Sequence, residues 1–425
     1  MITDFHIENF RSLKDVTFEC PPLSFFCGPN GSGKTNLAEA LDFLSKTFNN
    51  GLSYAVAEKG GFYNICFRRE RRSKGSIAFG VRGSETGGGG FPARRRLDYE
   101  IEFSLRTKGE AIRSDFYVES ERYVFNFDEN GPDSLRIEFR REDKRYVANV
   151  SKPITEVAKE HFPWLESADK IFEDLIKPDD RELLYPSRIS SFFPFVHAIL
   201  QPQHIRVFRL SPRFASRAGA PSVSGELGKY GENLPSALDY LYTHDKAAFE
   251  KLQRWVKDVV PDLEYLRTDY TQTRQMGLFM QERGFGAQWY AEELSDGTLM
   301  SIALFLAILD SRYSCIFIEE PENSLHPWIL RTFLECCREE SKYKQVMITT
   351  QSPLVVATAD PKSLFLVERK EGKTGVQTAA QREPMIHSII NNKLLDLGEY
   401  WISGGLKAVP GPPTIETDSL FREEE

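Results

Sequence analysis

The spacing of apolar residues along this chain predicts both strands and helices. A short apolar run over residues 23–27 predicts a buried strand, and a glycine-rich turn follows it. Residues 315–318 form a second continuous apolar run, typical of a central parallel strand covered on both faces, and residues 346–350 predict another strand. The residues after the glycine-rich turn recur at helical spacing and predict a helix with one buried face: Leu37, Ala40, Leu41, Leu44 and Phe48.

The middle of the chain changes its period. From residue 99 to residue 139 apolar and polar residues alternate in several short sets, which is typical of antiparallel sheet. The glycine-rich and basic stretch 81–98 before it predicts a surface loop. Further predictions are short helices broken by prolines over 154–200, helices over 233–260 and 298–309, a hairpin over 266–290 turning at 282–286, and a strand at 364–367 before a turn at 371–375. We find no heptad array, so long coiled-coil arms are not expected.

The glycine-rich turn carries the pattern Gly-x-x-x-x-Gly-Lys-Thr over residues 28–35. Its glycines let the backbone curl, so that successive N–H groups point at phosphate oxygens. Lys34 is expected to reach the β- and γ-phosphates of a nucleotide, and the hydroxyl of Thr35 to ligate Mg²⁺. The helix that begins here turns its positive dipole end toward the same phosphates. The predicted nucleotide contacts are Asn30, Gly31, Ser32, Gly33, Lys34, Thr35 and Asn36.

The apolar run 315–318 ends in two carboxylates, Glu319 and Glu320. Catalytic groups of open α/β sheets gather at the carboxyl ends of the strands. We expect Glu319 to hold Mg²⁺ through water, and Glu320 to orient or deprotonate the attacking water. A solvated acidic turn is the alternative interpretation, and the phosphate-loop pattern elsewhere in the chain argues against it.

Four segments together resemble the RecF/SMC-like branch of ABC ATPases. They are Ile-Glu-Asn-Phe-Arg-Ser-Leu at 7–13, the loop at 28–35, Leu-Ser-Asp-Gly-Thr at 294–298 and the stretch 317–327. More narrowly, the chain is similar to the stand-alone bacterial ATPases of the OLD (overcoming-lysogenisation-defect) type, many of which serve in antiphage defence. Gly-Glu-Asn-Leu, just before the helices at 233–260, also resembles a segment of that group. The likeness is thin across residues 100–200.

The resemblance implies an ATP site shared between two copies. In such proteins the signature loop of one subunit closes over the γ-phosphate held by the other, which would make Ser295 and Gly297 trans-acting contacts. An ordinary helix cap is the alternative for this loop, and Ser295 suits that role too. Arg11 corresponds to an arginine that touches the nucleotide in relatives, with a surface arginine as the alternative. Gln351 stands where relatives usually carry a γ-phosphate-sensing histidine; because glutamine donates a hydrogen bond but carries no charge, we expect slow hydrolysis.

Length and composition fit an α/β P-loop fold of the ABC-ATPase (RecF/SMC head) type with two lobes. The 425 residues exceed one ordinary domain. We predict an N-terminal ATPase lobe with the phosphate loop and the antiparallel sheet over 1–150, a mostly helical insertion over 151–260, a C-terminal ATPase lobe over 261–385 and a tail over 386–425. The six cysteines lack metal-binding spacing and are expected to be reduced thiols of a cytoplasmic protein. No apolar run is long enough to span a membrane.

The predicted function is an ATPase that uses ATP and Mg²⁺, forms a homodimer or higher oligomer through its ATP sites, and controls a separate effector protein, a nuclease or toxin. The segment after Gln351 is expected to be too short for the TOPRIM nuclease module of some OLD-type relatives, and Asp396, Glu399 and Asp418 do not suggest a metal cluster. One alternative is a RecF-like DNA-repair ATPase that acts directly on DNA. Another is a scaffold that binds ATP without hydrolysing it. A transporter subunit is disfavoured, because its signature usually reads Leu-Ser-Gly-Gly-Gln.

Charge leaves the partner open. The net charge of −8 argues against a surface coated for nucleic-acid binding. Two local basic clusters, Arg68–Lys74 and Arg94–Arg96, could contact nucleic acid or an acidic protein, or could belong to solvated loops.

Overall fold

The computed structural model describes residues 1–67, 76–86, 96–107, 116–127, 135–142, 145–151, 201–219, 225–284, 286–384, 386, 388 and 396–406. The helices predicted for 154–200 lie outside the described residues, as do the basic run Arg68–Lys74, Arg94, Arg95 and Asp418.

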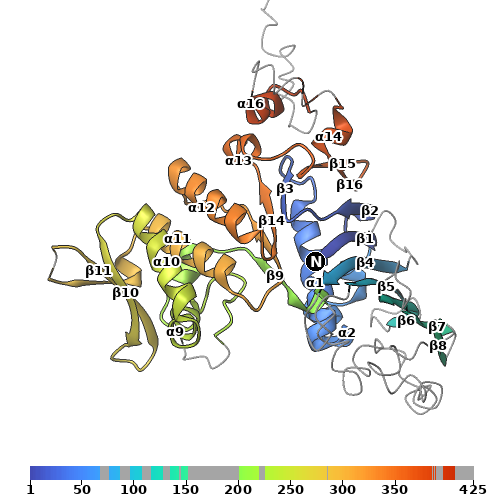
Figure 1. The fold of residues 1–425 in the computed structure, drawn as a ribbon, viewed down its shortest axis with the longest axis horizontal. Coiled ribbons are helices and arrows are strands. Elements are labelled where there is room, and N and C mark those ends of the chain that lie inside the picture. Colours follow the sequence, from blue (N-terminus) through green and yellow to red (C-terminus); the bar gives the residue numbers. More distant parts are fainter. Residues whose placement is uncertain are drawn as a thin grey trace, which may run out of the picture.

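A six-stranded sheet forms the centre of the molecule, with the order β16-β15-β3-β14-β13-β9 (Figure 1). All neighbours pair in parallel except β16, which is antiparallel to β15 at one edge. The strands predicted at 23–27, 315–318, 346–350 and 364–367 are all confirmed as members of this sheet. The bounds are β3 Leu23–Cys27, β9 Ile205–Phe208, β13 Cys315–Glu319, β14 Gln345–Thr350, β15 Leu364–Lys370 and β16 Lys373–Thr378. The sheet draws its strands from three of the predicted ranges, 1–150, 151–260 and 261–385, and so joins them.

Successive side chains of the central strands enter two different hydrophobic cores. In β3, Phe25 belongs to one core and Phe26 to the other, and Ile316 and Phe317 divide in the same way in β13. This explains why both strands are mostly apolar, since each strand is covered on both faces. The first core also contains α1 (Lys34–Asn50), α2 (Leu52–Glu58) and α3 (Phe62–Ile65). The helix predicted after the phosphate loop is therefore confirmed.

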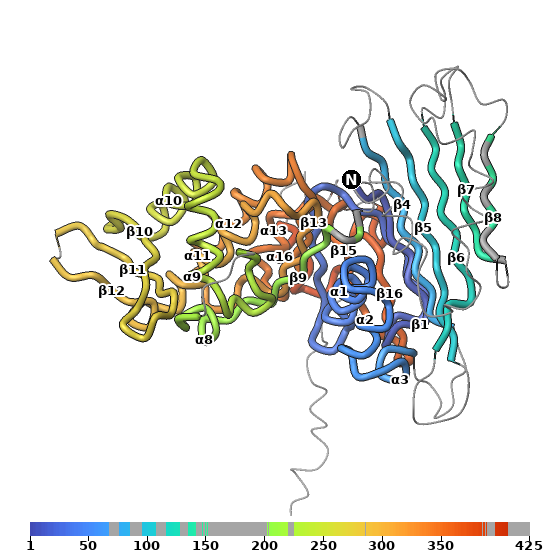
Figure 2. The backbone as a smooth tube through the Cα atoms, turned by 90° about the horizontal axis from the view of Figure 1, so that it is seen from below, coloured from blue at the N-terminus to red at the C-terminus, as the bar shows by residue number. Residues whose placement is uncertain are grey.

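A seven-stranded antiparallel sheet with the order β2-β1-β4-β5-β6-β7-β8 closes the first core and fans out to one side (Figure 2). Its strands are β1 Ile2–Phe10, β2 Leu13–Glu19, β4 Ile77–Thr86, β5 Arg96–Thr107, β6 Phe116–Phe127, β7 Leu135–Glu142 and β8 Arg145–Val150. The antiparallel prediction is confirmed, but the loop predicted at 81–98 was too long. β4 and β5 stay paired as far as Thr86 and Arg96. Gly83 suggested a loop, yet it lies in β4 opposite Tyr99, whose ring occupies the space that a side chain at position 83 would need.

Helices and a small sheet cover the other face of the central sheet. The helices are α8 Pro212–Ala215, α9 Leu234–His244, α10 Lys246–Val259, α11 Asp296–Leu309, α12 Pro327–Glu340, α13 Pro353–Ala357, α14 Ala379–Arg382 and α16 Leu397–Ile402, with 3-10 turns at Gln201–His204 and Ala291–Glu293. The hairpin predicted over 266–290 is confirmed in part. β11 (Met276–Glu282) and β12 (Gln288–Tyr290) pair antiparallel on either side of the predicted turn, but a further strand, β10 (Leu263–Tyr270), pairs with β11. The resulting three-stranded sheet lies at the end of the molecule opposite the seven-stranded sheet (Figure 1). Within the described segments, no helix combines the length and the apolar character needed to cross a membrane.

Candidate nucleotide-binding site

The phosphate loop connects the end of β3 to the start of α1, where two of its glycines are required by close contacts. A side-chain carbon at Gly28 would lie 2.1 Å from the carbonyl oxygen of Val367. At Gly33 the φ angle is +114°, and a side-chain carbon there would lie 2.1 Å from the hydroxyl oxygen of Thr374. The β15–β16 hairpin therefore supports the loop from behind. Gly31 also has a positive φ angle, and both Gly31 and Asn30 are exposed at the tip of the loop.

Lys34 lies inside this loop and is only 6% exposed. Its Nζ donates to the carbonyl oxygens of Gly28 (2.7 Å) and Pro29 (3.2 Å). Burial lowers the pKa of Lys34, while the carboxylate of Glu320 acts in the opposite direction. The hydroxyl of Ser32 is also buried and has no hydrogen-bond partner among the described residues. A buried cation and an unpaired donor in one loop fit a ligand that brings negatively charged oxygens.

Glu319 ends β13 and fits the predicted role of a magnesium ligand. Its side chain is buried and lies near the hydroxyl of Thr35, the other predicted ligand, which favours the ionised carboxylate, while its Oε1 has no hydrogen-bond partner among the described residues. Burial raises the pKa of Glu319. A carboxylate and a hydroxyl side by side, with one oxygen unsatisfied, form the kind of oxygen donor set that Mg²⁺ takes in nucleotide sites.

Glu320 has a left-handed backbone (φ 46°) that turns the chain sharply after β13. Its N–H donates to the carbonyl oxygen (3.0 Å) and the hydroxyl oxygen (3.1 Å) of Thr349 in the neighbouring strand β14. Two amides hold its carboxylate: Nε2 of Gln351 donates to Oε1 (2.6 Å), and Nδ2 of Asn323 donates to Oε2 (3.3 Å). Oε1 lies 4.0 Å from Nζ of Lys34. The structure thus brings Lys34, Glu320 and Gln351 together, and Gln351 contacts the glutamate directly.

Two residues that the sequence analysis did not single out complete this arrangement. Asn323 holds the second oxygen of Glu320. Glu322 accepts hydrogen bonds from the backbone N–H of Gln351 (2.7 Å) and the hydroxyl of Thr350 (2.8 Å), and burial raises its pKa. Both residues lie in the run Glu-Glu-Pro-Glu-Asn, and the polar composition of that run was the signal from which their role could have been predicted.

Arg11 belongs to a different group of charges. Its guanidinium lies 3.6 Å from Oε2 of Glu39 on α1, and its Nε is buried without a partner among the described residues. Glu39 also pairs with Lys59 (2.6 Å) and Lys229 (2.9 Å). Burial opposes ionisation of Glu39, but the two lysines outweigh it and lower its pKa. This network ties α1 to the turn between β1 and β2. Asn36, on the first turn of α1, donates to the hydroxyl of Ser12 in the same turn (2.6 Å).

The loop 294–298 precedes α11. Ser295 caps this helix, because its hydroxyl accepts from the backbone N–H of Thr298 (3.2 Å), and it is exposed. Gly297 lies against the turn after Glu320, where a side-chain carbon would come within 3.3 Å of the carbonyl oxygen of Ser324. Within the described part of one chain, no hydrogen bond or ion pair joins this loop to the phosphate loop.

The sheet order, the phosphate loop and the carboxylates at the end of β13 define a P-loop fold of the ABC-ATPase type. A solved structure described as an SMC head bound to the C-winged helix domain of ScpA shares this fold, with a TM-score of 0.51 and 14% identity over 91% of this chain and 99% of that one. The family described as "AAA domain, putative AbiEii toxin, Type IV TA system" matches residues 23–357, most of the chain, and the chain belongs to this family.

Two curated relatives agree with this assignment. The OLD nuclease of Thermus scotoductus is 22% identical over 396 residues, which is 90% of this chain and 65% of that protein. The DNA replication and repair protein RecF of Psychromonas ingrahamii is 34% identical over 84 residues, 19% of this chain and 23% of RecF. This chain therefore spans less than two thirds of either relative. It is an ATPase-type protein of the RecF/SMC-like, OLD-related group, as its motifs predicted.

Proposed function

We propose that this protein binds and hydrolyses ATP, with two copies sharing each site. The observation that carries the proposal is the position of Glu320, which lies 4.0 Å from the phosphate-loop lysine and is held by Gln351. A phosphate entering the loop would offer Lys34 a stronger partner than the two carbonyl oxygens it now contacts. Glu320, no longer facing Lys34 alone, would then be placed to accept a proton from the attacking water.

The remaining groups orient the substrate. The backbone N–H groups of residues 30–36 and the start of α1 would receive the β- and γ-phosphates. Thr35 and Glu319 would hold Mg²⁺, which neutralises charge on the phosphate oxygens. Asn323 and Gln351 keep Glu320 in one orientation, and Glu322 fixes the backbone of Gln351.

The sharing of each site is proposed from the exposure of the signature loop. Ser295 and Gly297 lie at the N-terminus of a 14-residue helix, whose dipole favours negative charge. No hydrogen bond or ion pair links them to the phosphate loop of the described chain, so a second copy would have to bring them there. In a symmetric pair each loop would close the other subunit's site.

We further propose that this ATP-driven association controls a separately encoded effector, in a defence system against phage. Support comes from the family to which the chain belongs and from its likeness to the OLD nuclease. ATP can change the effector only if the open and closed dimers bind it with different affinity.

Sedimentation of the Glu320→Gln variant with and without Mg-ATP tests the proposal, because slow hydrolysis would preserve the closed state. We expect association that depends on ATP, and its loss in Lys34→Ala. Lys362→Ala removes an exposed lysine outside the site and serves as the matched control. If Lys34→Ala binds ATP as tightly as the control, the proposed site is wrong.

A further inference from the structure

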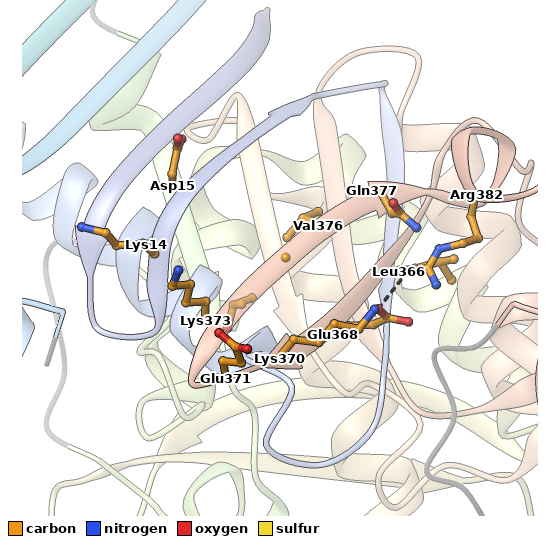
Figure 3. A pocket seen from close by; sticks show the side chains of 12 residues that line it. Lys14, Asp15, Leu366, Glu368, Lys370, Glu371, Lys373, Val376, Gln377 and Arg382 are labelled. Carbon is orange, nitrogen blue, oxygen red and sulfur yellow. Dashed lines mark ion pairs between the residues drawn. The ribbon is translucent and has the colours of Figure 1, made fainter. Parts of the chain in front are cut away.

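A hollow of about 730 Å³ lies beside the phosphate loop, on the side where the β15–β16 hairpin supports it (Figure 3). β2 contributes Lys14 and Asp15 to its wall, and the hairpin contributes most of the rest. Gly375 adds no side chain to this wall and has open space where a side chain would lie. The volume is within the range of small-molecule sites.

Cations outnumber carboxylates around this hollow. Glu368 is the most enclosed acid, and it is shared by Lys370 (2.9 Å) and Arg382 (2.9 Å). Two positive charges therefore meet one negative charge at this end of the hollow. Burial opposes ionisation of Glu368, but the two cations outweigh it and lower its pKa, so the carboxylate stays charged.

The other end of the hollow carries Lys14 and Lys373. Nζ of Lys14 donates to the amide oxygen of Asn9, a neutral group, and lies over the ring of Phe67. Lys373 forms no ion pair with any described residue. In Figure 3 its side chain extends from the hairpin toward β2. Asp15 also lines the hollow, and its Oδ1 lies 3.9 Å from Nδ1 of His6. Glu371 also borders this end, so the hollow as a whole is lined by four cations, Lys14, Lys370, Lys373 and Arg382, and by three carboxylates, Asp15, Glu368 and Glu371, on a chain whose net charge is −8.

Thr374 connects the wall of the hollow to the phosphate loop. Its hydroxyl donates to the carbonyl oxygen of Ser32 (2.9 Å) and contacts the hydroxyl of Ser12 (2.7 Å), and its backbone N–H donates to the carbonyl oxygen of Ser12 (2.8 Å). Thr374 is 3% exposed and occupies the space beside Gly33. A shift of β16 would therefore press on Ser32 and Gly33 of the phosphate loop, because packed contacts transmit displacement.

We propose that this hollow binds a small phosphate-bearing anion, and that its occupancy changes nucleotide binding through Thr374. The first claim, that the hollow binds such an anion, rests only on the hollow and the charges around it. The second claim, that occupancy changes nucleotide binding, rests on the proposed function, since it requires a nucleotide in the phosphate loop.

The binding half is tested in the Lys34→Ala background, which removes the phosphate-loop lysine as a competing site. Ribose 5-phosphate and AMP are titrated and followed by phosphorus NMR and calorimetry, with adenosine as the arm without phosphate. We expect at least one phosphate ester to bind, and Lys373→Ala to weaken it about tenfold, the usual effect of losing one charge-assisted hydrogen bond. The two esters distinguish a nucleotide from a sugar phosphate. Lys362→Ala, an exposed lysine of the same region outside the hollow, should bind as tightly as the parent.

Absence of phosphate-ester binding, equal binding by adenosine, or unchanged binding in both Lys373→Ala and Lys373→Glu overturns the site. The second variant reverses the charge of a half-buried lysine beside the exposed turn of the hairpin, and its melting temperature, compared with that of the parent, shows whether it folds. The site test does not depend on ATP binding by the wild type, so its outcome is separate from that of the proposed function.

The coupling half compares ATP affinity with and without the bound ester. We expect a change of about fivefold in the wild type, equal in both directions because linkage is reciprocal. Thr374→Val keeps the side-chain volume but removes the hydroxyl. This variant should still bind the phosphate ester, but the ester should no longer change its affinity for ATP. Thr374→Ser has a hydroxyl at this position and should show the ester-dependent change in ATP affinity again. An unchanged coupling in Thr374→Val shows that Thr374 does not transmit the effect.

Discussion

Gln351 donates its side-chain N–H to Oε1 of Glu320 across 2.6 Å, and the same carboxylate oxygen lies 4.0 Å from Nζ of Lys34. Three segments far apart in the sequence thus meet at one carboxylate. Gln351 would therefore act on the reaction indirectly, because it orients the glutamate that would activate the water.

Replacing Glu320 with Gln should slow ATP hydrolysis by about 10²–10⁴-fold while ATP still binds, since the variant keeps the shape but loses the base. Single-turnover hydrolysis and equilibrium binding measure the two effects separately. Hydrolysis at the wild-type rate would show that Glu320 is not the base.

Gln351→Ala should lower kcat about tenfold with little change in KM, because Glu320 loses the hydrogen bond that fixes its Oε1. Gln351→His supplies a donor again and should recover part of the rate. Faster turnover in Gln351→Ala would mean that Gln351 restrains Glu320 and does not position it.

The raised pKa of Glu319 makes its role dependent on pH. Burial favours the protonated form in the folded protein, so this carboxyl destabilises the fold increasingly as pH rises through its range. Mg²⁺ needs the ionised form, so the Mg²⁺ concentration needed for half-maximal hydrolysis should rise as pH falls toward the raised pKa of Glu319. Glu319→Gln should weaken the response to Mg²⁺, flatten this pH dependence and raise the melting temperature near neutral pH. An unchanged magnesium titration in Glu319→Gln would contradict the assignment.

The 425-residue chain should not cleave DNA or RNA by itself, with any divalent metal. Metal-dependent nucleases use clustered carboxylates to place their ions. Among the described residues, one group of three side chains has suitable spacing, His6, Glu8 and Asp15, and it contains only two carboxylates, of which Glu8 is half-buried and Asp15 exposed. Gel assays with the purified protein and with Lys34→Ala check this. Nuclease activity that follows the protein through purification and survives in Lys34→Ala would reveal a second catalytic site.

Local patterns were sufficient to predict the phosphate loop and its flanking strand and helix. The glycines at 28 and 33 and the apolar spacing of α1 are properties of neighbouring residues. The contact between Glu320 and Gln351 could not be predicted in this way, because it depends on β13 and β14 pairing in parallel with Glu319 opposite Thr349.

Two other features escaped prediction for physical reasons. The turn between β10 and β11 has no glycine or proline; it is closed by Arg274 in a left-handed conformation, so the sequence indicated only the later turn at 282–286. The link between Thr374 and the phosphate loop joins residues 342 positions apart. Nothing in the local composition of the hairpin indicated it.

The shared site is tested most directly by mixing two inactive variants. Ser295→Arg spoils the signature loop but keeps its phosphate loop, and Lys34→Ala does the reverse. Neither should hydrolyse ATP alone. In a mixed dimer one site combines the intact phosphate loop of the first with the intact signature loop of the second, so an equal mixture should recover up to about a quarter of the wild-type rate. Full activity of Ser295→Arg alone, or an equal mixture as inactive as its components, would contradict a site completed by two copies.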